Sequence, residues 1–179
     1  MVQQAMSLFD QNNLPGYDEL VAMADKGQIN LVSELWKLRR RCPKEMKPEQ
    51  CSERIRAFLA SKFAEPDNKK IIALYDKYLI YEKNMREYDF GKASLQERFN
   101  ILKQKRREYL GDYNARLVFG LDEARVEYNQ RMADFMKDAK DLSGDERVKQ
   151  WNDMRKDVYG DYYNAVTAKE EKFNVYDIE

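Results

Sequence analysis

The sequence contains no histidine among its 179 residues. Histidine is the side chain that most often serves as a general base near neutral pH and as a ligand for transition metals. Its absence excludes Ser-His-Asp and Cys-His catalytic arrangements, and also the Glu-x-x-His pairs of di-iron helical bundles. Two cysteines alone do not complete a four-ligand zinc site. We therefore predict no catalytic and no metal-binding residue.

Glycine is also scarce, and its seven residues stand singly. Neither GxGxxG nor GxxxxGK[ST] occurs, so no loop of the kind that cradles a nucleotide phosphate is present. We interpret the acidic pairs Asp122–Glu123 and Glu170–Glu171 as charges near helix starts and on solvated surface. A hydrolase built on paired carboxylates is the alternative at this point. We predict that the chain is not an enzyme and binds no cofactor.

An excess of charge of one sign is lacking, since 32 Lys and Arg balance 32 Asp and Glu. Phosphate neutralisation drives nucleic-acid binding, so a basic excess is usual in proteins that bind nucleic acid, and we expect no such partner here. No run of about 18 apolar residues occurs, so no membrane span is predicted. The start, MVQQAMSLFDQNN, lacks the charged and apolar regions of a signal peptide, which a mature chain would have lost.

Proline is confined to positions 15, 43, 48 and 66. The proline-free stretch from 67 to 179 can be almost continuously helical, and nothing alternates with period two as a strand does. With 36% charged residues, an elongated body fits better than a ball with a deep core. We predict an all-α fold, with a small helical mini-domain over 1–65 that carries the cysteine loop and an extended, bent multi-helix arm over 66–179.

Helix boundaries follow from capping residues and from apolar residues that recur every three or four positions. Ser94 with Glu97 and Ser143 with Glu146 match the capping-box pattern. The predicted helices cover 17–26, 29–41, 48–65, 66–88, 95–110, 112–119, 121–142, 144–159 and part of the tyrosine-rich tail.

Two glycines nine positions apart, Gly111 and Gly120, predict an elbow in the arm at 111–121. Gly111 is expected to end one helix, and Asp112 to cap a helix of only two turns. Gly120 would end that short helix, and Asp122 would cap the next one. Glycine adopts left-handed conformations at little cost, so each position permits a sharp change of direction.

Aromatic residues are divided between the core and a candidate binding surface. Trp36 and Trp151 lie on apolar stripes and are predicted to be buried, as are Tyr75 and Tyr78. Four other tyrosines either pack between helices or present a surface to a protein partner, and both readings are open. These candidate partner-binding aromatics are Tyr81, Tyr159, Tyr162 and Tyr163.

Both cysteines, Cys42 and Cys51, lie in one proline-containing stretch, RRRCPKEMKPEQC. A local disulfide is the favoured interpretation, and a ring of that size stabilises a protein by about 2 to 3 kcal/mol. The alternative is a pair of free thiols in a cytosolic protein. A disulfide implies an oxidising compartment such as the periplasm.

From Glu53 to about residue 160 the chain resembles the lipase-specific foldases, the steric chaperones of secreted bacterial lipases. The resemblance lies in SERIRAFLASKF, IIALYDKYLIYEKNMRE, LSGDERVKQWNDMRKDVYG and above all in the pair RREYLG, residues 106–111, and VFGLDE, residues 118–123. It implies an extended helical body whose concave side embraces a protein client.

The family's activating motif, R-x-x-F-[DC], has no match in this chain. The corresponding stretch, KLRRRCPKEM, lacks phenylalanine, and Phe9–Asp10 follows Met6 where the motif has arginine. The Lys- and Tyr-rich, histidine-free helices are also similar in texture to the sheath proteins of periplasmic flagella. We therefore interpret the chain as a periplasmic, protein-binding scaffold such as a flagellar filament coat, with filament subunits as partners. The alternative is a lipase-specific foldase with a lipase client.

Overall fold

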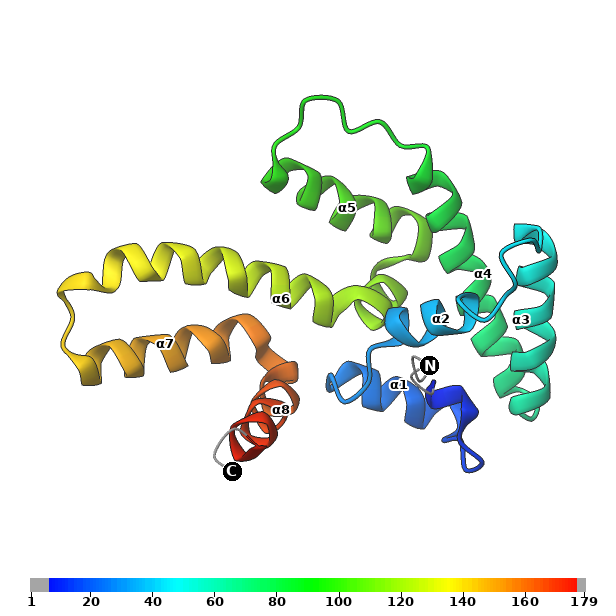
Figure 1. Ribbon diagram of the computed structural model, residues 1–179, viewed down its shortest axis with the longest axis horizontal. Coiled ribbons are helices and arrows are strands. Elements are labelled where there is room, and N and C mark those ends of the chain that lie inside the picture. The colour runs from blue at the N-terminus through cyan, green and yellow to red at the C-terminus, as the bar shows by residue number, and fades with distance from the viewer. Residues whose placement is uncertain (1–6, 177–179) are drawn as a thin grey trace.

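The computed structural model describes the backbone of residues 7–176 and the side chains of residues 7–170. Within that range the secondary structure is entirely helical, so the predicted all-α fold is confirmed. The α-helices are α1 (Tyr17–Asp25), α2 (Leu31–Arg39), α3 (Pro48–Lys62), α4 (Asp67–Arg86), α5 (Leu95–Leu110), α6 (Asp112–Asp138), α7 (Gly144–Tyr159) and α8 (Tyr163–Tyr176) (Figure 1). Short 3-10 helices are η1 (Leu8–Asp10), η2 (Ala139–Asp141) and η3 (Gly160–Tyr162).

Two capping boxes begin helices where the sequence predicts them. The Ser94 N–H donates to Glu97 Oε2 at 2.7 Å, and the Glu97 N–H donates to Ser94 Oγ at 3.3 Å. Ser143 and Glu146 repeat this exchange at the start of α7. Each box satisfies backbone donors that a helix start leaves without an intrahelical partner, so it fixes the first turn.

The predicted elbow contains one bend and not two. Gly111 adopts φ +79° between α5 and α6, which confirms the first bend. The expected break at Gly120 is wrong, because α6 runs without interruption from Asp112 to Asp138. Asp112 is accordingly the first residue of a long helix, and Asp122 lies inside that helix and caps nothing.

Gly120 is required for packing and not for a turn. A Cβ built at this position would lie 2.2 Å from the hydroxyl oxygen of Tyr162. The residue therefore lets η3 approach the side of α6 closely. A sequence pattern does not distinguish such a glycine from one that ends a helix, because both interrupt an apolar stripe.

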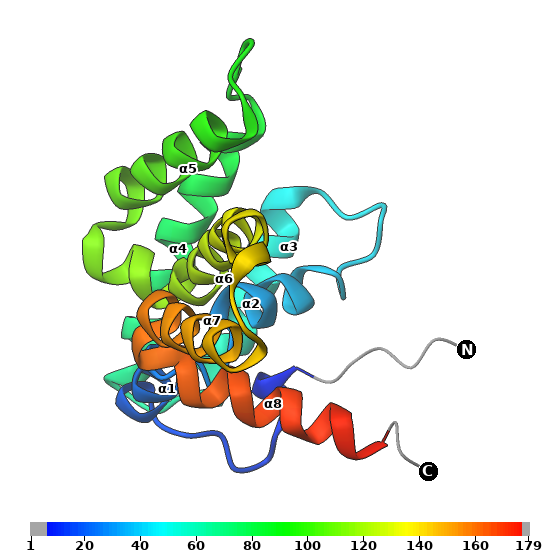
Figure 2. The same ribbon diagram turned by 90° about the vertical axis from the view of Figure 1, so that its left-hand side faces the viewer.

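The helices form two hairpins on a compact base. Helices α4 and α5 form one hairpin, and α6 and α7 form a second that projects away from α1–α3 (Figure 1). The view turned by 90° looks toward the end of this projecting arm and shows α6 and α7 next to each other (Figure 2). We call the hairpin of α6 and α7 the α6–α7 arm.

Two groups of buried side chains hold these elements together. The larger core joins α1–α4 with the end of α5 and the first turns of α6, and it includes side chains from both sides of the predicted boundary at residue 66. A smaller core forms where α6 meets the end of α7, from Leu121, Ala124, Tyr159 and Tyr162. The division into two domains stays a prediction.

The aromatic predictions have mixed outcomes. Tyr75 and Tyr78 are buried as expected. The prediction for Trp36 is wrong, since this side chain is 49% exposed while Leu31, Leu35 and Leu38 form the inner face of α2. Trp151 is half-buried, and its indole N–H donates to the Tyr128 hydroxyl at 3.0 Å.

Candidate functional site

The bend at Gly111 is closed by a buried ion-pair cluster between α5 and α6. Arg107 donates to both carboxylate oxygens of Glu123, at 3.2 and 2.9 Å, and Arg106 donates to Glu123 Oε1 at 3.1 Å. The Arg106 guanidinium also lies 4.1 Å from the centre of the Phe119 ring. The fold thus brings RREYLG and VFGLDE, the two segments that carry most of the family resemblance, into direct contact.

The role of Glu123 was missed from the sequence. This side chain is only 5% exposed and lies inside α6, so its interpretation as a charge at a helix start is wrong. The hydrogen bond to Glu123 raises the pKa of Arg107. In the other acidic pair, Glu170 accepts a hydrogen bond from the buried Arg155, whereas the side chain of Glu171 lies outside the described residues.

Most of the candidate partner-binding aromatics are not available to a partner. Tyr81 packs edge-on against Phe119 inside the larger core, with 5.2 Å between ring centres. Tyr159 and Tyr162 belong to the smaller core. The surface reading is therefore wrong for these three residues, because helix packing covers them, and Tyr163 is half-buried beside that core.

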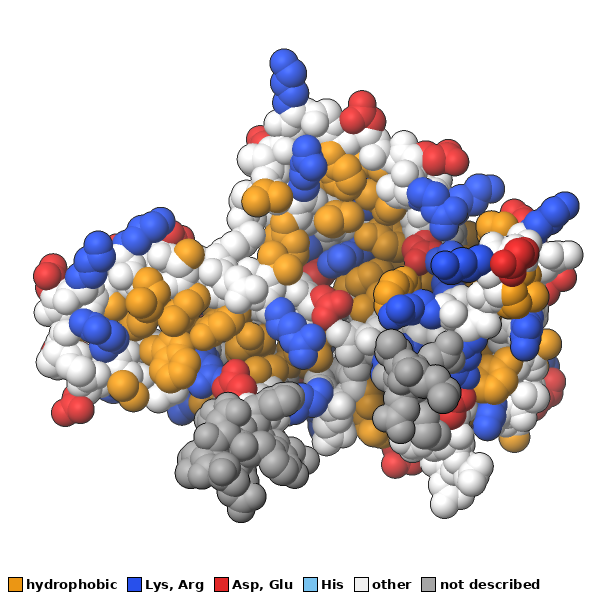
Figure 3. Space-filling view, viewed as in Figure 1, with side chains coloured by type: hydrophobic (Ala, Val, Ile, Leu, Met, Phe, Trp, Pro, Cys, Tyr) orange, Lys and Arg blue, Asp and Glu red, His pale blue; other side chains and the backbone are white. Residues whose placement is uncertain are grey.

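Exposed apolar side chains instead gather on the α6–α7 arm. Met136 and Val148 are 56% and 54% exposed. They line an apolar hollow of about 250 Å³ between the two helices, together with Met132, Phe135, Arg147 and Trp151. Figure 3 shows hydrophobic side chains along this arm. Exposed apolar patches commonly mark protein interaction sites.

A second hollow on the arm has a different chemistry. It has a volume of about 630 Å³, and its lining combines the apolar side chains of Phe135 and Met154 with four aspartates. Its lining residues are Arg131, Asp134, Phe135, Asp138, Gln150, Asp153, Met154 and Asp157. The arm therefore offers both apolar and acidic surface to a protein.

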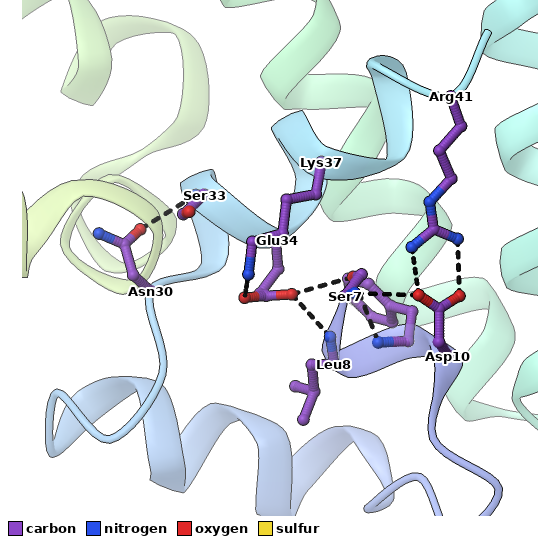
Figure 4. Close-up of polar contacts among 9 residues, drawn as sticks. Ser7, Leu8, Asp10, Asn30, Ser33, Glu34, Lys37 and Arg41 are labelled. Carbon is purple, nitrogen blue, oxygen red and sulfur yellow. Dashed lines mark hydrogen bonds and ion pairs between the residues drawn. The ribbon is translucent and has the colours of Figure 1, made fainter. Parts of the chain in front are cut away.

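At the start of the described chain, Asp10 is held by Arg41, which lies in the turn after α2 (Figure 4). Phe9 is fully buried and meets Phe63 edge-on, with 6.2 Å between ring centres. The Arg41 guanidinium donates to Asp10 Oδ1 at 2.6 Å and also contacts the second carboxylate oxygen. An arginine of KLRRRCPKEM thus contacts the Phe-Asp pair from a separate segment.

Glu34, a carboxylate on α2, also holds the segment that contains Asp10. Glu34 accepts hydrogen bonds from the Ser7 hydroxyl at 2.9 Å and from the Leu8 N–H at 2.7 Å (Figure 4). The pKa of Asp10 lies below its ordinary value, and the hydrogen bond from Arg41 contributes most to this lowering. Residues 7–10 are therefore fixed to α2 and to the turn that follows it by polar contacts on both sides of the buried Phe9.

The cysteines are joined as the sequence predicts. Cys42 and Cys51 form a disulfide with 5.8 Å between their Cα atoms, which links the loop after α2 to the first turn of α3. Among the described residues, no group of three or more acidic or cysteine side chains is arranged to hold a metal ion. No helix in the same part of the chain is both long and apolar enough to cross a membrane.

Comparison with protein families gives a match for the part of the chain from α4 to α8. Residues 74–176 match the family model of the proteobacterial lipase chaperone protein. The match covers more than half of the chain, so the protein belongs to this family. Neither a curated protein nor a solved structure matches the chain.

The family membership changes the balance between the two functional readings. It favours the lipase-specific foldase, which the sequence offered as the alternative, over the flagellar sheath. Neither the structure nor the comparisons support a sheath or filament subunits as partners. The matched region begins at Leu74 in α4 and includes the Arg106, Arg107 and Glu123 cluster, whereas the disulfide and Phe9 lie before it.

Proposed function

We propose that the protein is a steric chaperone that binds a lipase while the lipase folds, and that it catalyses no reaction itself. The family match across α4–α8 is the observation that carries this proposal. The Cys42–Cys51 disulfide supports an oxidising compartment such as the periplasm as its location.

The α6–α7 arm has the form that such binding needs. It projects from the base, so it presents a large contact area without a large core of its own (Figure 1). Its exposed Met136 and Val148 offer apolar contacts that a folding lipase would bury. The rigid cluster around Glu123 holds α6 at a set angle to α5. We therefore place the main client contact on this arm.

The N-terminal contacts favour an active chaperone over an inert scaffold. The activating motif of the family is not continuous in this sequence, but Arg41 from one segment pairs with Asp10 of another, and Asp10 directly follows the buried Phe9. We propose that Arg41, with Phe9 and Asp10, takes the place of that motif. The substitution Arg41→Ala is then expected to lower refolding yield while leaving lipase binding to the arm intact.

A refolding assay tests the proposed function. A panel of secreted proteobacterial lipases is denatured in urea and diluted with or without an equimolar amount of the chain. We expect the chain to raise the recovered activity of at least one lipase, with saturation near equal concentrations. If no lipase in the panel gains activity, the foldase proposal is wrong.

Two matched variants test the location of the contact. Val148 on the arm and Ile80 on α4 are both 54% exposed. We expect Val148→Asp to raise the chaperone concentration needed for a given recovery of lipase activity at least tenfold. A tenfold change corresponds to about 1.4 kcal/mol of binding free energy. Ile80→Asp is expected to leave the assay unchanged. Equal effects of both variants would contradict a contact centred on the arm.

A further inference from the structure

The connection between α2 and α3 concentrates positive charge in a chain that has no net charge. Residues 37–47 contain six cationic side chains and one acidic side chain, Glu45. Three of the cations are neutralised: Lys37 by Glu34, Arg39 by Glu82 and Arg41 by Asp10. The other three have no carboxylate within ion-pair distance among the described residues; they are Arg40, Lys44 and Lys47.

The fold holds these cations outward. The Cys42–Cys51 disulfide fastens the loop to α3, and the side chains of Cys42 and Met46 pack against the core. A turn in which the Met46 N–H donates to the Pro43 carbonyl at 3.0 Å leaves Lys44 exposed. Figure 2 shows this loop standing out from the body of the molecule.

An exposed tryptophan lies next to one of these cations, Arg40. Trp36 is half exposed, and the Arg40 guanidinium lies 4.7 Å from the centre of its ring. Three leucines already complete the buried face of α2, so the indole ring is not needed for the core. A tryptophan ring is amphipathic and suits the boundary between water and an apolar phase. We call Trp36, Arg40, Lys44 and Lys47 the basic corner.

We propose that the basic corner docks onto the surface of a membrane that contains anionic lipids. Cations near such a surface are attracted to the lipid headgroups, and the Trp36 ring would enter the interface. The loop that carries Lys44 and Lys47 stands out from the body of the molecule, which suits contact with a broad surface better than the enclosure of a peptide (Figure 2). The nearest hollow, between α2, α3 and α4, has side chains of both charge signs and is lined by none of the four residues.

This inference does not depend on the proposed chaperone function. The basic corner lies outside residues 74–176, which carry the family match. In Figure 1 the loop between α2 and α3 lies on the side of the molecule away from the projecting end of the α6–α7 arm. A chain bound through the corner would keep the arm directed toward a client in solution.

Vesicle binding tests the proposal directly. The substitution Trp151→Phe leaves Trp36 as the single tryptophan, so its fluorescence reports on the corner alone. We expect a blue shift and co-sedimentation with vesicles of phosphatidylglycerol and phosphatidylcholine, and neither with phosphatidylcholine alone. Both signals should disappear in high salt, which screens exposed charges. Absence of both signals with the anionic vesicles would overturn the proposal.

A pair of triple variants separates the corner from general charge. Arg40→Gln with Lys44→Gln and Lys47→Gln should weaken vesicle partitioning about 100-fold, since each cation near the surface contributes separately. The control changes three exposed lysines elsewhere, Lys77, Lys92 and Lys149, to glutamine and removes the same charge. An equal loss in both variants would contradict the basic corner.

The remaining outcomes distinguish the partner and the function. Binding to polyglutamate without binding to anionic vesicles would replace the membrane by an acidic protein partner and overturn the proposal. Lipase refolding in solution by the corner variant should equal that of the unchanged chain. Circular dichroism confirms beforehand that each variant is folded.

Discussion

Arg107 donates to both carboxylate oxygens of Glu123 and so ties the last turns of α5 to the middle of α6. Arg106 reaches the same carboxylate while its guanidinium covers Phe119. Gly111 bends the chain between these two helices. The cluster therefore fixes the direction in which the α6–α7 arm leaves the base, and the arm is where we place the client.

Replacing Glu123 by glutamine should destabilise the protein strongly. The substitution leaves two arginines, partly buried, without their counter-charge, and removing one member of a buried pair costs about 3 kcal/mol. Urea unfolding measures this loss. Glu127→Gln is the matched control, one turn along α6, where no ion pair occurs among the described residues. A loss below about 1 kcal/mol for Glu123→Gln would show that the cluster does not hold the bend.

Gly120→Ala should destabilise the protein although alanine favours helix by about 1 kcal/mol over glycine. The new methyl group would overlap the Tyr162 hydroxyl, which lies 2.2 Å from the Cβ position. Adding Tyr162→Phe should restore much of the stability, because it removes that hydroxyl. Gly144→Ala is the control, since no atom lies within 4 Å of its Cβ position. A stabilising effect of Gly120→Ala alone would disprove the close approach of η3.

The disulfide should be detectable and should contribute to stability. Thiol titration of the denatured chain without reductant is expected to find no free thiol. Replacing Cys42 and Cys51 by serine should lower the free energy of unfolding by about 2 to 3 kcal/mol, as expected for a short closed loop. Two reactive thiols in the purified chain would contradict the bond.

The Asp10–Arg41 pair should add stability that depends on pH. The pKa of Asp10 in the folded protein lies below its ordinary value. The stabilisation is therefore complete above the pKa of an aspartate in the unfolded chain, about 3.9, and it is lost as the pH falls through the pKa of Asp10 in the folded protein. Asp10→Asn should therefore be less stable than the unchanged chain at pH 7, and the difference should shrink below about pH 4.

The control for this pH dependence is Asp153→Asn, at an exposed aspartate without an ion pair among the described residues. In urea unfolding at pH 7, the free energy of unfolding of this variant should equal that of the unchanged chain. A stability difference for Asp10→Asn that is constant from pH 7 to pH 3 would mean that the carboxylate charge is not what holds residues 7–10.

Local signals in the sequence predicted most of the helix boundaries. The capping residues Ser94 and Ser143 act within one turn, so their effect can be read from four neighbouring residues. The Cys42–Cys51 bond is likewise local. Gly111 was read correctly because the residue that follows a helix and the bend that it permits are adjacent in the chain.

The errors concern residues whose environment is set by distant segments. Gly120 depends on Tyr162, and Glu123 depends on two arginines of the preceding helix. Trp36 is exposed because α2 directs its leucines toward the core. The apolar stripe includes both the leucines and the tryptophan, so it does not determine how the helix is rotated about its axis. The contact of Arg41 with Asp10 joins segments on either side of α1. Such partners become visible only when the helices are placed in space.

Hydrogen exchange of the chain with and without a refolded lipase tests the central claim most directly. The claim is that the α6–α7 arm binds the lipase client. It predicts that an equimolar lipase slows amide exchange in the last turns of α6 and the first turns of α7, around Met136 and Val148. Unchanged exchange on the arm in a chain that still binds the lipase would contradict the claim.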